Sequence, residues 1–140
     1  MGILRGVHEL YGGHHLLVDC YEAPRDICLN DRLLLETLAE AAKSAGATVI
    51  SQVRYRFGAD SPPGCTALIM LDESHCSVHT YADPGLLAFD FFTCGDTDAR
   101  QVWEFVQKKL GLTHAIVREV HRFTSGASAS DEPVIHEARG

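Results

Sequence analysis

Residues 65–81 have the sequence CTALIMLDESHCSVHTY, and this stretch decides the fold of the chain. The segment Cys65–Leu71 is almost entirely apolar, and Ser74–Tyr81 mixes small, β-branched and aromatic residues. Short segments of this composition are typical of strands, and the acidic pair Asp72-Glu73 between them has the polar character of a turn. The stretch therefore predicts two strands joined at Asp72-Glu73.

The flanking sequence adds further strands and two helices. Apolar residues recur at helical spacing over 31–45 and again over 98–110. Asn30 or Asp31 can cap the first of these helices, and Gly46 can end it. Strands are predicted at residues 16–21, 48–57, 86–92 and 115–120. The resulting order, β-α-β-β-β-β-α-β, predicts an α+β fold: a two-layer sandwich in which a mainly antiparallel sheet carries two helices packed on one face.

Length and composition fit one domain. The chain has 140 residues, of which 46% are hydrophobic, so it can bury a core of its own. We assign residues 1–123 to a single domain and the small, polar residues 124–140 to a flexible C-terminal tail. With both helices on one face, the other face of the sheet needs a partner, which favours a dimer.

Charge and cysteine content narrow the functional classes. The net charge of −7 and the lack of any basic run argue against a nucleic acid or an anionic membrane as partner. No stretch approaches the roughly 20 apolar residues that cross a bilayer, and residues 1–10 lack the apolar core of a signal peptide. The five cysteines are widely spaced and form no C-x-x-C pair, as is typical of reduced cytosolic thiols. We expect a cytoplasmic protein.

Residues 71–81 and 92–95 carry the candidate chemistry, and three interpretations compete for them. The simplest is a strand whose histidines form ordinary hydrogen bonds. A metal site from His75, Cys76 and His79 is weaker, because side chains alternate along a strand and Cys76 then points away from both histidines. Hydrolysis by a Ser–His pair is also weak, because the sequence has no G-x-S-x-G motif and nothing singles out an orienting carboxylate.

A combination of short motifs favours a fourth interpretation of these residues. The motifs are Glu73-Ser74-His75, His79-Thr80, Phe92-Thr93-Cys94-Gly95, Gly13-His14-His15-Leu16, residues 44–48 and Arg56-Phe57. Over about residues 13–123 the chain thereby resembles the short prokaryotic S-adenosylmethionine decarboxylase proenzymes, which depend on a pyruvoyl group. Each motif alone is weak, but the combination is specific, with His79 five residues and Cys94 twenty residues after Ser74.

The resemblance implies a proenzyme that cuts its own chain between Glu73 and Ser74. The Ser74 hydroxyl would attack the preceding carbonyl, and the ester would break by elimination to leave a covalent pyruvoyl cofactor at the start of residues 74–140. That cofactor would hold the substrate amine as a Schiff base while the carboxylate leaves. By resemblance, His79 assists the cleavage and Cys94 donates a proton to the product. Without the motif, Cys94 would count as a small buried residue.

Departures from the family pattern bear on processing and on substrate recognition. Thr66 stands where the family carries a serine that supports processing. Phe57, Tyr81 and Asp83 are the candidate substrate-binding residues. By resemblance, Phe57 stacks on adenine, with an ordinary core role as the alternative, and Asp83 is one methylene shorter than the family's glutamate. The resemblance also implies arginine and ornithine as alternative substrates, since some members of the superfamily act on such basic amino acids. Asp83 or Asp60 could bind their cationic side chain.

Two roles remain open for the chain. The first is an active decarboxylase, a homodimer with sites near the subunit interface, that supplies the aminopropyl donor for polyamine and spermidine synthesis. The second is an inactive relative that serves as a regulatory or partner subunit. The chain's only lysines, Lys43, Lys108 and Lys109, all fall on predicted helices. This argues against pyridoxal phosphate, which needs a lysine to hold it, and no metal is expected.

We also expect strain in the turn at residues 72–74. A strained turn would raise the energy of the peptide bond that the self-cleavage has to break. The backbone angles of this turn test that expectation.

Overall fold

The computed structural model describes residues 11–123 and 134–139. Within these residues the strands are β1 (Gly13–Cys20), β2 (Val49–Arg56), β3 (Cys65–Leu71), β4 (Ser74–Tyr81), β5 (Leu86–Cys94), β6 (His114–Arg122) and β7 (Val134–Arg139). The helices are α2 (Arg25–Cys28), α3 (Asp31–Ser44) and α4 (Ala99–Leu110). None of these helices has the length and apolar character that crossing a membrane requires.

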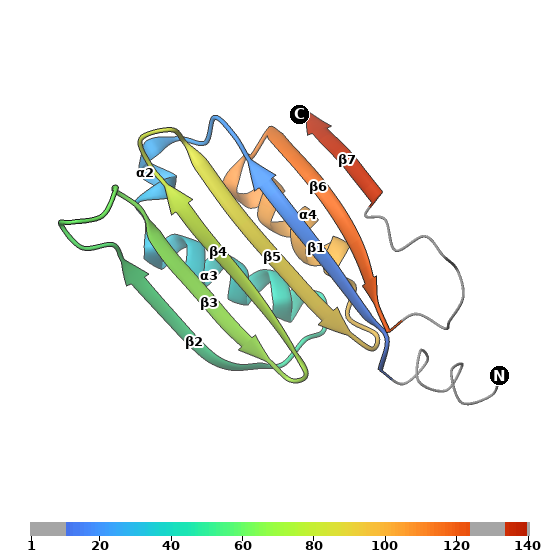
Figure 1. Ribbon diagram of the computed structural model, residues 1–140. Helices are drawn as coiled ribbons and strands as arrows, with labels where there is room; N and C mark the ends of the chain where they lie inside the picture. The colour runs from blue at the N-terminus through green and yellow to red at the C-terminus, as the bar shows by residue number, and fades with distance from the viewer. Residues whose placement is uncertain (1–10, 124–133, 140) are drawn as a thin grey trace, which may run out of the picture.

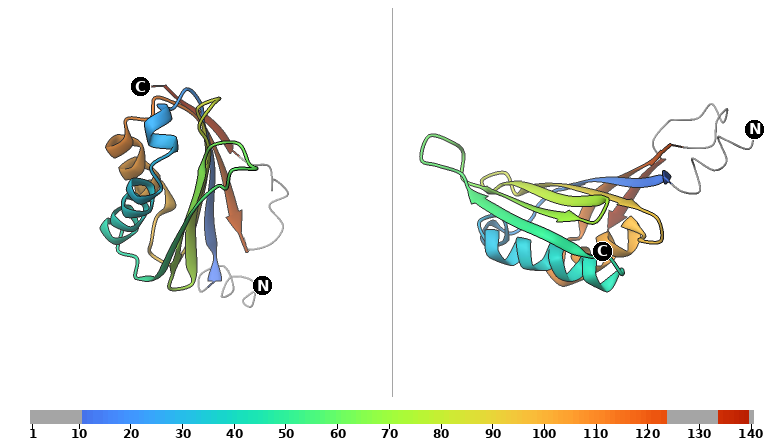
Figure 2. Two further views of the ribbon diagram at one scale, coloured as in Figure 1. Left: turned by 90° about the vertical axis from the view of Figure 1, so that its left-hand side faces the viewer. Right: turned by 90° about the horizontal axis from the view of Figure 1, so that it is seen from below.

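All the described strands join one antiparallel sheet in the order β2-β3-β4-β5-β1-β6-β7. The helices lie on one face of this sheet and leave the other face open (Figures 1 and 2). The α+β two-layer sandwich predicted from the sequence is therefore confirmed, with the two long helices on one face as expected.

The hydrophobic core lies between the sheet and the helices, because strand alternation gives each central strand one apolar side. In β5, Leu87, Phe89 and Phe91 are buried, whereas the residues between them are half-buried. The rings of Phe89 and Phe91 stack with their centroids 5.4 Å apart, and both contact Trp103 of α4. Helix α3 packs on β2 and β3, and α4 packs on β5 and β1, so the two helices together cover the sheet from its β2 edge to β1.

Both long helices begin and end at residues that suit those positions. The side chain of Asn30, rather than Asp31, caps α3 by accepting a backbone N–H three residues later at 3.0 Å. Asp98 caps α4, and its carboxylate accepts the backbone N–H of Arg100, two residues later, at 2.9 Å. Gly46 and Gly111 follow the two helices with φ of 90° and 65°, a left-handed conformation that glycine adopts without steric cost.

The structure differs from the prediction at the C-terminal segment and in one short helix. Residues 134–139 form β7, antiparallel to β6, and do not belong to a flexible tail. Residues 124–133 of that predicted tail lie outside the described residues. The composition of residues 124–140 hid the strand, because an edge strand takes its hydrogen bonds from its neighbour and needs little apolar surface. The single turn α2 was also not predicted.

The open face of the sheet has an apolar half and a polar centre. On β2, β3 and β4 it exposes a group of large apolar and aromatic side chains, which are 37% to 62% exposed: Val53, Tyr55, Leu68, Met70 and Tyr81. On β4, β5 and β1 it carries polar side chains: His15, His75, His79 and Asp90. Exposed apolar patches of this kind are typical of surfaces that contact a partner.

Candidate active site

Ser74 is the first residue of β4 and follows a tight turn. Asp72 and Glu73 connect β3 to β4, and Leu71 and Ser74 are the last paired residues on either side. Glu73 has φ of 63°, a left-handed conformation that costs a residue with a side chain about 1–2 kcal/mol. The strain expected in this turn is therefore present, next to the peptide bond at which the sequence predicts cleavage.

The hydroxyl of Ser74 contacts the main chain of Cys94. The backbone N–H of Cys94 donates a hydrogen bond to Oγ of Ser74 at 3.1 Å, because β5 ends beside the start of β4. The alternating burial along β5 places Cys94 on the open face with Asp90 and Phe92. The structure thus brings Ser74 and Cys94 together, with the hydroxyl at the main chain of Cys94 and not at its thiol.

Thr66 and His79 form a second pair on the open face. They are cross-strand partners on β3 and β4, and Oγ1 of Thr66 lies 2.7 Å from Nδ1 of His79. The His79 ring is exposed. This hydrogen bond orients the ring and leaves Nε2 for another partner, which is the arrangement that a proton acceptor needs.

The two pairs lie far apart within one chain. Ser74 and His79 are five residues apart on one continuous strand, which corresponds to about 17 Å at roughly 3.4 Å per residue. A proton passes directly between groups that are about 3 Å apart. The structure therefore does not place His79 where it can take the proton of Ser74 in the same chain.

The polar centre of the open face is built on a hydrogen bond that the sequence analysis did not single out. Nε2 of His15 donates to Oδ1 of Asp90 at 3.1 Å, and this bond lowers the pKa of Asp90. The rings of His15, His75 and Phe92 contact one another, with centroids 5.6 to 6.4 Å apart. A signal was available, because Asp90 is the one charged residue in an otherwise apolar strand.

The alternative metal site at His75, Cys76 and His79 does not form. Cys76 is buried on the helix side of β4, whereas both histidines are exposed on the other side. The alternation that argued against this site is confirmed.

The three predicted substrate-binding residues lie at the end of the sheet opposite Ser74. Tyr81 ends β4 seven residues after Ser74, about 24 Å away, and its ring centroid is 6.2 Å from that of Phe57. Phe57 lies outside the core and lines a surface hollow of about 260 Å³. Asp83 forms an ion pair with Arg25 of α2. None of these three side chains is near the Ser74 of the same chain.

Comparison with known proteins assigns the chain to a family. The family model described as S-adenosylmethionine decarboxylase matches residues 14–123. Over 119 residues the chain is 35% identical to the S-adenosylmethionine decarboxylase proenzyme of Prochlorococcus marinus, which covers 84% of this chain and 93% of that protein. The chain belongs to the S-adenosylmethionine decarboxylase family.

Other S-adenosylmethionine decarboxylase sequences and structures agree with this assignment. The proenzyme of Thermotoga maritima is 32% identical over 124 residues, which cover 86% of this chain and 93% of that protein. A crystal structure of the adenosylmethionine decarboxylase of Aquifex aeolicus matches with a TM-score of 0.68 and 27% identity, over 86% of this chain and 96% of that one. The resemblance and the fold predicted from the sequence are therefore confirmed.

In this member of the S-adenosylmethionine decarboxylase family, one cysteine is accessible. Cys20, Cys28, Cys65 and Cys76 are buried, and Cys94 is half-buried. Burial raises the pKa of Cys20 and Cys76 to about 12, so these thiols stay neutral and unreactive at neutral pH. A reagent that modifies exposed thiols should therefore act first on Cys94.

The lowered pKa of Asp90 predicts a pH-dependent contribution to stability. Because His15 holds the pKa of Asp90 below its ordinary value of 3.8, the unfolded chain binds the proton more readily than the folded one. The stabilisation is complete above that ordinary value and is lost as the pH falls through the folded value. We expect Asp90→Asn to lower the free energy of unfolding at neutral pH, and the difference from the unmodified chain to shrink below pH 3.8.

Urea unfolding of both proteins between about pH 7 and pH 2 measures this difference. Asp60→Asn in the exposed loop between β2 and β3 is the control and should leave the profile unchanged. A destabilisation by Asp90→Asn of the same size at every pH would show that the His15 contact does not act through the charge of Asp90.

Proposed function

We propose that this chain is a proenzyme that cuts itself between Glu73 and Ser74 and then decarboxylates S-adenosylmethionine, which supplies the aminopropyl donor for polyamine synthesis. The observation that carries the proposal is the position of Ser74 in a chain of this family. It follows a left-handed Glu73, and its hydroxyl oxygen is held by the Cys94 N–H. The hydroxyl and the strained peptide bond are thus adjacent.

The cleavage rearranges the bond between Glu73 and Ser74. The Ser74 hydroxyl gives up its proton and its oxygen bonds to the Glu73 carbonyl carbon, while the C–N bond breaks and the amine of residue 74 is released. Elimination then detaches the Glu73 carboxylate, with loss of the α-proton of residue 74. Water replaces the nitrogen of residue 74, which leaves as ammonia. The first step also relieves the left-handed conformation of Glu73.

The proton acceptor for this cleavage comes from a second copy of the chain. His79 and Thr66 lie on the open face about 17 Å along the sheet from Ser74. Two sheets that pack open face against open face in antiparallel directions bring the middle and far end of one sheet over the Ser74 end of the other. The exposed apolar residues of β2 and β3 supply the surface for this homodimer.

The same packing explains the positions of the predicted substrate-binding residues. Phe57, Tyr81 and Asp83 lie at the far end of the sheet from the Ser74 of their own chain. In a face-to-face dimer they approach the Ser74 of the partner. The aromatic rings of Phe57 and Tyr81 then offer a flat apolar surface that suits an adenine ring.

The residues around Ser74 fit a covalent pyruvoyl group. The chain's three lysines lie on α3 and α4, so no lysine on the open face is available to hold a carbonyl cofactor. A pyruvoyl group supplies a carbonyl that takes up a primary amine and withdraws electrons from its α-carbon. Once cleaved, residue 74 is released from the turn and can move towards the open face, where Cys94 donates the proton that replaces the carboxylate.

S-adenosylmethionine is favoured over arginine or ornithine as the substrate. The carboxylate of Asp83, one of the two groups that could bind a cationic side chain, is already paired with Arg25. The other, Asp60, lies in the exposed loop between β2 and β3. Aromatic rings and not free carboxylates therefore dominate the end of the sheet at which the substrate would bind.

The denatured mass of the purified protein tests the proposal. We expect two chains, residues 1–73 and 74–140, with the second lighter by one ammonia than a peptide that starts with serine. S-adenosylmethionine, arginine and ornithine are then compared as substrates by release of carbon dioxide. A single intact chain that stays uncut for days at neutral pH would contradict self-cleavage and favour the inactive partner subunit.

A further inference from the structure

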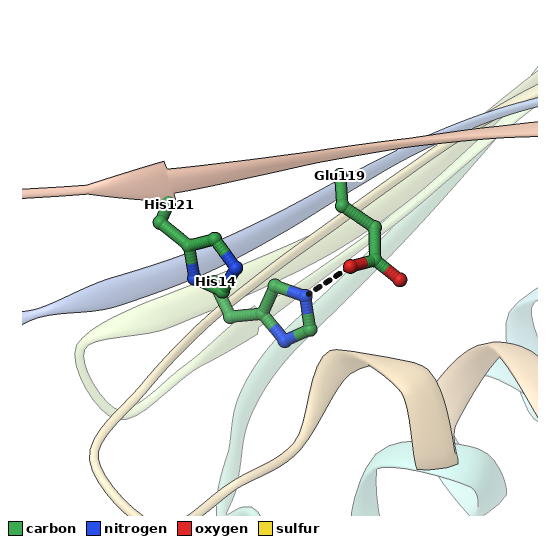
Figure 3. A group of neighbouring side chains, drawn as sticks. All are labelled: His14, Glu119 and His121. Atoms are coloured by element: carbon green, nitrogen blue, oxygen red, sulfur yellow. Dashed lines mark ion pairs between the residues drawn. The ribbon is translucent and has the colours of Figure 1, made fainter. Parts of the chain in front are cut away.

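Three potential metal ligands meet on the helix side of the sheet, where β1 begins and β6 ends. They are His14 of β1 and Glu119 and His121 of β6, and their ligand atoms all lie within 4.8 Å of one another (Figure 3). His14 and His121 are cross-strand partners, and Glu119 is on the same side of β6 as His121. This group lies apart from the polar centre of the open face.

The two ring nitrogens of His14 have the surroundings that are usual for a histidine that binds a metal. Its Nε2 is buried and has no hydrogen-bond partner among the described residues, and it lies 3.9 Å from Oε2 of Glu119. Its Nδ1 lies 3.5 Å from Oδ1 of Asp98. A carboxylate at the far nitrogen is the usual outer partner of a histidine that ligates a metal through its other nitrogen.

Neighbouring charged and polar side chains hold the carboxylate of Glu119 in place, as Asp98 does for the ring of His14. Its Oε1 pairs with Arg100 of α4 and lies 3.6 Å from Nε2 of His136 in β7. Its Oε2 is the atom that faces His14. The side chain of Glu119 is only 11% exposed, so its carboxylate is fixed by these neighbours and not by water. One oxygen therefore remains directed at the unpartnered nitrogen of His14.

His121 completes the set after a rotation of its ring. The rings of His14 and His121 stack with centroids 4.9 Å apart and planes 7° apart, so their lone pairs do not yet converge. His121 is exposed and its ring can turn without disturbing the core. In a tetrahedral zinc site the ligand atoms are about 3.4 Å apart. The His14–Glu119 separation of 3.9 Å thus needs to close by only a few tenths of an ångström.

We propose that His14, Glu119 and His121 bind a divalent transition-metal ion of the zinc type, with water in the fourth position. Two imidazoles and one carboxylate are ligands that zinc accepts, and three protein ligands leave one position open. The ion would join β1 to β6. It would lie between two and three strands from β4, about 12 Å from Ser74 at the ordinary strand spacing.

The test uses the Ser74→Ala chain, in which metal binding is independent of self-cleavage and of activity. The protein is freed of metal with EDTA and titrated with zinc chloride by calorimetry. We expect one zinc ion per chain and a higher midpoint of thermal unfolding with zinc. His14→Ala and His121→Ala should each weaken binding at least about 10-fold. Circular dichroism confirms that both variants fold.

Two further variants distinguish zinc binding at this site from unspecific zinc binding by surface histidines. Asp98→Asn keeps a good helix cap but removes the carboxylate beside His14, and should weaken binding about 10- to 100-fold. His114→Ala is the matched control, because His114 is an exposed histidine of the same strand that faces Glu22. It should bind zinc as the parent chain does.

Cobalt(II) identifies the ligands by absorption. Binding by His14, Glu119 and His121 should give visible d–d bands without thiolate-to-cobalt charge transfer. A thiolate band would place the ion at a cysteine and overturn the site. The site would also be overturned by unchanged zinc affinity in His14→Ala and His121→Ala, or by an equal loss of affinity in His114→Ala.

Discussion

Cells that express the Ser74→Ala chain together with the His79→Ala chain should contain cleaved protein, although neither chain is cut when it is expressed alone. Ser74→Ala removes the attacking hydroxyl. His79→Ala removes the proton acceptor, which lies about 17 Å from the Ser74 of its own chain. In a mixed dimer, the His79→Ala chain supplies Ser74 and its partner supplies His79, so one complete cleavage site is rebuilt.

Different affinity tags on the two chains make the result quantitative. With equal expression and random pairing, about half of the His79→Ala chains face a partner that carries His79, and these are the chains that should be cut. Mass spectrometry of each tagged chain measures the fraction. The control pairs the His79→Ala chain with a Ser74→Ala/His79→Ala chain, which has no His79 to contribute and should yield no cleavage.

Two outcomes of this experiment would contradict cleavage that depends on the His79 of the partner chain. If His79 acts on the Ser74 of its own chain, the mixed dimer contains no complete site and both chains stay intact. Cleavage of the His79→Ala chain alone, at the parental rate, would remove His79 from the mechanism. Either outcome contradicts the face-to-face dimer as the basis of processing.

Cys94→Ala should leave self-cleavage intact and slow decarboxylation by about 100-fold or more in kcat. The structure separates the two roles, because Cys94 contacts the Ser74 hydroxyl through its backbone N–H, which alanine keeps. The thiol itself lies on the open face with Asp90 and Phe92. Removal of the thiol therefore removes a proton donor for the product and nothing that holds the serine.

The denatured mass and the release of carbon dioxide from saturating S-adenosylmethionine measure the two effects separately. Cys76→Ala is the matched control: it removes a thiol that is buried on the helix side, so the cleaved enzyme should retain its kcat, at some cost in stability. Alkylation of the unmodified enzyme should mimic Cys94→Ala, because Cys94 is the accessible cysteine. Full activity of Cys94→Ala would show that another group donates the proton.

The fold could be predicted from the sequence because its signals are local. The apolar and β-branched composition of residues 65–81 and 86–92 and the helical spacing in residues 31–45 and 98–110 each depend on neighbours a few residues apart. The strand β7 could not be predicted in this way. It is held by hydrogen bonds to β6, a strand that ends more than ten residues earlier in the chain.

The candidate site was predicted in part. Ser74, His79 and Cys94 follow from short motifs whose spacing is visible in the sequence. The hydrogen bond between His15 and Asp90 joins residues 75 positions apart, and the motifs assign Asp90 no role. The cluster of His14 and Glu119 is likewise a product of the pairing of β1 with β6.

The sequence by itself determined the two long helices, six of the strands and the residues that carry the motifs of the family. Those properties depend on local periodicity and on residue identity. Only the tertiary structure decided that Ser74 lies beside Cys94, that His79 pairs with Thr66 and that His15 reaches Asp90. The physical reason is that distances between strands are set by sheet order and register, which arise from hydrogen bonds between segments remote in the chain.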